Sequence, residues 1–156
     1  MSVKSQFLKK LHARQQTTTP FISKSQADIA AFRLQMDKLL LQMHSWLAGT
    51  GLEPESLMTS ITDLLVEGGA FDIAGIVVRY DERAIKFMPI FLYGQGVTGC
   101  VEVTLHDNSL LTSLGRLFIR NGRVSGWVFS SPEALSRAEK LFDESTFFTL
   151  ILALMP

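Results

Sequence analysis

The sequence lacks the features on which disulfide bonding, metal binding and secretion usually depend. Cys100 is its only cysteine, which excludes an internal disulfide and a cysteine-rich metal site. The three histidines, His12, His44 and His106, have neither H-x-x-x-H nor H-E-x-x-H spacing, so no metal site is predicted. The N-terminus has no apolar stretch of about 7–15 residues typical of a secretory signal. We expect a cytoplasmic protein without a cofactor.

Long apolar runs are also missing. The longest uncharged apolar run, residues 147–155, is far shorter than the ~20 residues that a membrane-spanning helix needs. No transmembrane segment is therefore expected. With 156 residues, of which 47% are hydrophobic, the chain has enough apolar material for the core of one domain.

A catalytic constellation is absent as well, although residues 94–101 resemble one. They match G-x-G-x-x-G-x-V, the pattern of dinucleotide-binding and kinase phosphate loops. The residues that follow alternate between apolar and polar, which indicates a strand where a dinucleotide site needs a helix, and no lysine stands where a kinase needs one. Cys100 and His106 would lie about 20 Å apart on one strand, too far for a catalytic dyad. The pattern predicts a glycine-rich strand connection, with no catalytic residue and no enzyme.

The formal net charge of zero hides a difference between the two parts of the chain. Residues 1–50 carry seven basic and two acidic side chains, a net +5, while residues 51–156 carry eight basic and 13 acidic ones, a net −5. The two parts could attract each other within the fold, or the basic part could bind an acidic partner. Because the folded part would be acidic and repel phosphates, we do not expect nucleic acid as a partner.

The first 23 residues predict a basic amphipathic arm followed by a polar linker. Val3, Phe7 and Leu11 recur every four residues, and basic side chains surround them, among them Lys9 and Lys10. Residues 15–20 form a polar segment that ends in proline, which predicts a break in the helix. The arm could dock on its own domain, or fold onto a protein partner or another copy, giving a homo-oligomer through residues 1–20. Lipid binding is less favoured, because the apolar face is narrow.

Residues 24–156 predict a single α+β domain. A helix is expected from Ser25 to Leu47, ended by Gly49 and Gly51. Its apolar face comprises Ile29, Phe32, Met36, Leu39, Leu40, Met43, Trp46 and Leu47. Strands are expected at 60–66, 73–80, 85–92, 99–106, 114–120 and 123–129, with Pro89 marking an edge strand or a bulge. A short helix starting at 131–133 and a last helix capped by Asp143 follow, although the Phe and Thr content of the last element also allows a strand. The expected fold is an antiparallel meander of about six strands packed by a long N-terminal and a C-terminal helix.

Asn121-Gly122 is the strongest turn signal in the chain and predicts a two-residue hairpin. Such a turn would bring five side chains together on the outward face of the sheet, namely Arg116, Phe118, Arg120, Arg123 and Trp127. One interpretation is that nearby acids such as Glu102 neutralise the arginines and that Arg116 stacks on Trp127. The other is a surface that binds an acidic protein, since arginine and tryptophan are enriched at binding hot spots.

These observations favour a non-enzymatic protein-interaction module. In its architecture the chain is similar to small bacterial accessory proteins such as toxin-immunity proteins and secretion-system adaptors, a similarity that covers no motif. Its candidate binding residues lie on the arm and on the hairpin. The alternative is a small-ligand-binding domain with an apolar cavity between the sheet and the helix, and the 94–99 loop at its mouth.

Overall fold

The computed structural model describes residues 3–66, 68–120, 126–132 and 139–155, with the backbone alone for residues 11–23. A long helix, α1 (Val3–Leu47), precedes a seven-stranded antiparallel sheet in which every strand pairs with the next along the chain. Its strands are β1 (Pro54–Thr62), β2 (Ala70–Tyr80), β3 (Arg83–Gly94), β4 (Val97–Asp107), β5 (Leu110–Arg120), β6 (Val128–Ser130) and β7 (Lys140–Leu141). The chain continues with α2 (Glu144–Ile151) and a 3₁₀ turn (Leu152–Leu154). The predicted α+β meander is confirmed, with one strand more than expected.

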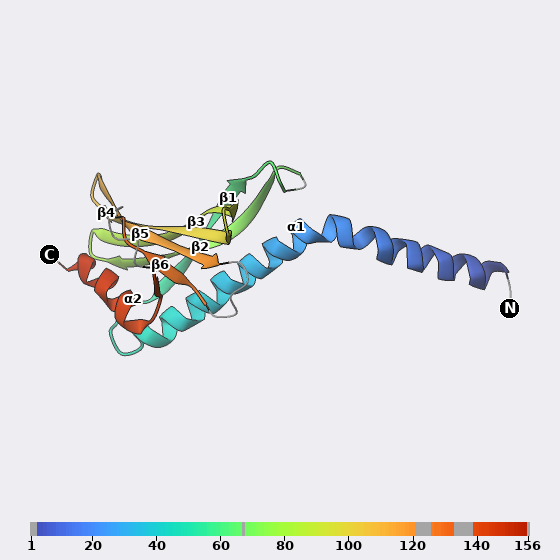
Figure 1. Cartoon of the computed structure of the whole chain (residues 1–156). Helices are drawn as coiled ribbons and strands as arrows, with labels where there is room; N and C mark the ends of the chain where they lie inside the picture. Colours follow the sequence, from blue (N-terminus) through green and yellow to red (C-terminus); the bar gives the residue numbers. More distant parts are fainter. Residues whose placement is uncertain (1–2, 67, 121–125, 133–138, 156) are drawn as a thin grey trace.

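Both helices lie on the same side of the sheet, and α1 extends far beyond it (Figure 1). The part of α1 that lies against the sheet buries the predicted apolar face, with Phe32, Leu39 and Met43 at most 1% exposed. The helix ends where predicted, at Gly49 and Gly51, which both have a φ of +83°.

The prediction that the helix breaks at residues 15–20 is wrong, since α1 runs without interruption through all 45 of its residues. Glutamine has a high helix propensity, and threonine disfavours a helix only slightly. Residues 15–19 are therefore compatible with a helix, although their polarity suggested a loop. An interior proline removes one backbone hydrogen bond, which kinks or breaks a helix, and at Pro20 the helix continues. Residues 3–20 are therefore joined to the body by a continuous helix.

The bounds of β1 and β6 differ from those of the predicted strands at 60–66 and 123–129. β1 ends at Thr62, because Asp63 starts a turn in which its carboxylate accepts the backbone N–H of Leu65 at 2.9 Å. The register between β3 and β4 shifts between Pro89 and Phe91, so the proline marks a bulge in an inner strand. β6 begins only at Val128. The predicted Asn121-Gly122 hairpin and the helix starting at 131–133 fall largely on residues outside the described ranges.

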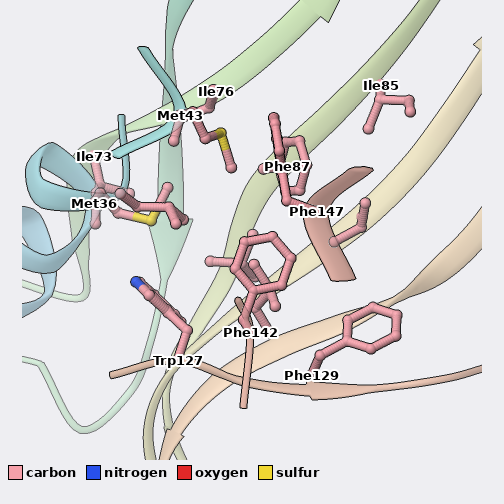
Figure 2. Close-up of a cluster of buried hydrophobic side chains, with 14 of the residues drawn as sticks. Met36, Met43, Ile73, Ile76, Ile85, Phe87, Trp127, Phe129, Phe142 and Phe147 are labelled. Atoms are coloured by element: carbon pink, nitrogen blue, oxygen red, sulfur yellow. The ribbon is translucent and has the colours of Figure 1, made fainter. Parts of the chain in front are cut away.

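A cluster of aromatic side chains fills the space between the sheet and the helices (Figure 2). Phe147 of α2 is fully buried, and its ring lies 5.1–6.3 Å from four others, those of Trp46, Phe87, Phe142 and Phe148. These rings come from α1, β3, the segment after β7 and α2. The cluster therefore joins both helices to the sheet. At the start of α2, the carboxylate of the N-cap residue Asp143 accepts the backbone N–H of Thr146 at 2.8 Å.

Candidate functional site

The N-terminal arm, defined here as residues 3–23 of α1, projects away from the body of the protein (Figure 1). Its described side chains, those of residues 3–10, are all exposed. Val3 is 82% exposed, Phe7 62% and Leu8 44%, and the predicted binding residues Lys9 and Lys10 are exposed beside them. The side chain of Leu11, also predicted to bind, is outside the described part. The arm thus presents apolar and basic groups to solvent together.

Two polar contacts hold α1 to the sheet just after the arm. The Tyr93 hydroxyl donates a hydrogen bond of 2.6 Å to the Asp28 carboxylate. Arg33 donates from Nε and Nη2 to the backbone carbonyl oxygen of Asp72, at 3.0 and 2.6 Å. Burial and the Asp28 carboxylate raise the pKa of Tyr93 to about 12, so this phenol remains a donor throughout the neutral range. These contacts mark the end of the docked part of the helix.

Replacing Tyr93 with phenylalanine is expected to lower the free energy of unfolding by about 1 kcal/mol, since it removes one partly exposed hydrogen bond. The Tyr93 pKa is raised from 10.0 to about 12, so its contribution is complete below pH 10 and is lost as the pH rises to about 12. Urea unfolding at several pH values measures both effects. The loss of stability above pH 10 should be smaller in Tyr93→Phe than in the wild type, whereas Tyr80→Phe, a change at an exposed tyrosine, should behave as the wild type. Equal losses in all three proteins would contradict the assignment.

The predicted hairpin surface is only partly assembled. Arg120 lies over the Phe118 ring, 4.9 Å from its centroid, and forms a salt bridge with Glu139 in which Nε is 3.1 Å from Oε2. Arg116 is exposed and stands directly opposite Glu102 in the pairing of β4 with β5. Two of the arginines thus have acidic neighbours, as expected if nearby acids neutralise this surface. Glu139 is the neighbour that sequence reasoning missed, because nothing local connects residues 120 and 139.

Trp127 corrects the predicted geometry of this surface. A two-residue turn would pair Phe118 with Ser125, but Phe118 pairs with Val128, an offset of three residues. An odd offset exchanges the two faces of a strand, so Trp127 moves from the outward face to the core. It is 5% exposed, 6.1 Å from the Phe32 ring, and its indole N–H, which has no acceptor among the described residues, is directed towards α1 (Figure 2). Arg123 falls outside the described residues.

Cys100 and His106 are the side chains most suggestive of chemistry, and they lie at different places on β4. Burial raises the pKa of the Cys100 thiol to about 11, and the side chain is 1% exposed. Burial and then the charge of Lys86 lower the pKa of His106, whose Nε2 is 3.0 Å from the Thr104 hydroxyl. The thiol is thus protonated at physiological pH and a poor nucleophile, and His106, six positions along the same strand, is too far away to activate it. Within the described ranges no three His, Cys, Asp or Glu side chains are grouped closely enough to hold a metal ion.

An apolar groove that sequence reasoning missed lies between the C-terminal end of α1 and α2. It has a volume of about 330 Å³ and is lined by Leu47, Thr50, Leu52, Tyr80, Phe148, Ile151, Leu152 and Met155. Leu152 is 68% exposed and Met155 42%, so the groove opens to solvent. The signal available in the sequence was the apolar residues of the last helix that do not fit one buried face.

Comparisons with protein-family models, with curated proteins and with solved structures find no match to this chain. Among the described helices, none has an apolar stretch long enough to cross a bilayer.

Proposed function

We propose that this protein is a non-enzymatic protein-interaction module whose N-terminal arm is the principal contact. The observation that carries the proposal is that the arm exposes Val3, Phe7 and Leu8 on a helix that projects from the body (Figure 1). Exposed apolar side chains of a projecting helix gain free energy only when another surface covers them, at about 1.5–3 kcal/mol for each large side chain. A helix of this kind is suited to docking in a groove of another molecule.

The charge of the arm defines the chemistry of the surface it would bind. The arm carries four basic side chains, those of Lys4, Lys9, Lys10 and Arg14, and no acidic one, since the first acid of the chain is Asp28. A surface with acidic groups around an apolar centre would match both properties and would associate faster at low salt. The partner in this proposal is therefore an acidic protein surface in the cytoplasm. The arginines of β5 contribute less, because Arg120 is already engaged by Glu139.

Affinity capture from extracts of the producing cell tests the proposal. Phe7→Asp/Leu8→Asp places charges on the apolar side of the arm, and we expect at least about a tenfold loss of the captured partner. Leu41→Asp is the matched control, since Leu41 is also on α1 and is 68% exposed but lies on the body. Capture that is equal for the wild type and the arm variant would contradict the role of the arm.

Small-ligand binding is the second candidate function, and the apolar groove favours it. The centre between α1 and the sheet is filled by side chains such as Phe32, which lies so close to Gly99 that an added Cβ would be 3.1 Å from its ring. The groove at the end of α1, with few polar atoms in its lining, is the better place for a ligand. A small molecule that co-purifies with the wild type in native mass spectrometry, and is lost in Leu152→Glu, would support this alternative.

A further inference from the structure

Acidic side chains border the apolar groove, whereas the charged side chains of the arm are all basic. Tyr80 lines the groove and also an adjoining polar hollow that contains Asp81 and Glu82. Both acids are exposed, as is Glu53, which adjoins Leu52 in the lining. None of these three carboxylates forms an ion pair within the described residues.

The one arginine in the adjoining hollow is already engaged. Arg83 forms a salt bridge with Asp107, whose carboxylate is 3.2 Å from the Arg83 guanidinium. The guanidinium also donates to the backbone carbonyls of Ala153 at 3.1 Å and of Met155 at 3.4 Å. These contacts neutralise Asp107 and hold the C-terminal segment beside the groove. Asp81, Glu82 and Glu53 thus leave the border with a net negative charge.

The arm also exposes apolar side chains, and its charge is opposite to that of the border. Its exposed apolar side chains, Val3, Phe7 and Leu8, alternate with Lys4, Lys9 and Lys10 along two turns of helix. A helix that places apolar side chains in a groove and lysines beside acidic rims is a common mode of recognition. The arm and the groove are therefore complementary in both hydrophobicity and charge.

The arm cannot reach the groove of its own chain. Leu47 lines the groove and belongs to the same continuous helix as Phe7. Forty residues of helix at 1.5 Å rise separate them by about 60 Å. In Figure 1 the start of α1 and α2 lie at opposite ends of the molecule. The groove that the arm could occupy must belong to another molecule.

We propose that the N-terminal arm of one copy of this chain docks in the apolar groove of a second copy, between the end of α1 and α2. This proposal rests on the function proposed above and identifies the partner as the protein itself. If two copies exchange arms reciprocally, the contacts close into a symmetric dimer in which both grooves are filled. Each interface would then contain apolar contacts at its centre and lysine–carboxylate pairs at its border.

The mass of the full chain in solution, measured by light scattering during size-exclusion chromatography, provides the first test. The wild type is expected at twice the 17.4 kDa of the monomer, and at the monomer mass in high salt or after dilution. Phe7→Asp/Leu8→Asp should be monomeric, and so should Leu152→Glu, which changes an exposed residue of the groove. Leu41→Asp, the control on the outward side of α1, should remain a dimer. Circular dichroism of each variant separates loss of association from loss of folding.

A mixture of the two monomeric variants provides the decisive test. The groove variant retains an intact arm, and the arm variant retains an intact groove, so an equimolar mixture should recover a dimer with one functional interface. Recovery of the dimer supports docking of the arm in the groove. Dimerisation of Leu152→Glu alone, with no recovery in the mixture, would show instead that two arms pair with each other, and it would overturn the proposal.

A wild type that is monomeric at every concentration would also overturn self-docking, without touching the proposed function. In that case, arm-dependent capture of a different protein would still support the interaction module, with a foreign partner. Arm-dependent binding to anionic vesicles by the monomer would overturn both, because a membrane surface would then be what covers the arm.

Discussion

Phe147→Ala is expected to lower the free energy of unfolding by about 3–5 kcal/mol, the largest effect of any single substitution discussed for this protein. The side chain is fully buried, and its ring packs against four others that come from both helices, from β3 and from the segment after β7. Removing it loses the transfer free energy of the ring and leaves a cavity that several rigid neighbours border, so the surroundings cannot collapse to fill it.

Urea and thermal unfolding measure this effect. For a chain of 156 residues, a loss of this size corresponds to a fall in Tm on the order of 10 °C. Leu110→Ala, at a residue 70% exposed on the hairpin between β4 and β5, should change stability by less than about 0.5 kcal/mol. A cost below about 1 kcal/mol for Phe147→Ala would show that the aromatic cluster does not hold α2 to the rest of the fold.

Gly115→Ala is expected to cost about 2–4 kcal/mol, the second largest effect, for reasons of backbone conformation and space. Gly115 has a φ of +139°, a conformation that residues with a side chain rarely adopt. An added Cβ would lie 2.5 Å from the backbone carbonyl oxygen of Ser130 and 2.7 Å from the Phe129 ring. The oxygen belongs to β6, the neighbouring strand, and cannot move without displacing that strand.

Gly96→Ala is the matched control for the backbone contribution. Gly96 also has a positive φ, +71°, but the nearest atom to an added Cβ is the end of the Arg120 side chain, 3.8 Å away. Its cost should be about 1–2 kcal/mol, from the left-handed conformation alone. If both alanine variants unfold at the same urea concentration, the close approach of β5 to β6 at Gly115 contributes nothing to stability.

The order of the elements and the core face of the main helix could be predicted from the sequence, because both depend on local periodicity. The apolar residues between Ile29 and Leu47 recur at helical spacing, and β2 to β5 lie close to the predicted strands. Asp143 was recognisable as a helix cap for the same reason, since a cap bonds to a residue only three positions away. The amphipathic character of the arm was likewise readable from its spacing.

The predicted site was less accurate, because it required a register. The outward position of Trp127 depended on a two-residue turn at Asn121-Gly122, and an offset of three residues in the β5–β6 pairing was enough to place the indole in the core. The continuity of α1 through residues 15–20 was also missed, since a polar segment ending in proline has the same composition whether it is a linker or a helix.

The sequence by itself determined the local elements and the charge of this protein: an amphipathic helix, alternating strands, a helix cap, and a basic arm ahead of an acidic domain. Only the tertiary structure decided which of these surfaces remain open. The apolar groove is formed by three separate regions of the chain, residues 47–52, Tyr80 and the segment 148–155. The distance of about 60 Å between arm and groove follows from one unbroken helix. Local patterns specify which side chains are apolar or charged, but contacts between distant residues determine whether a side chain is covered by its own chain or is left for another molecule.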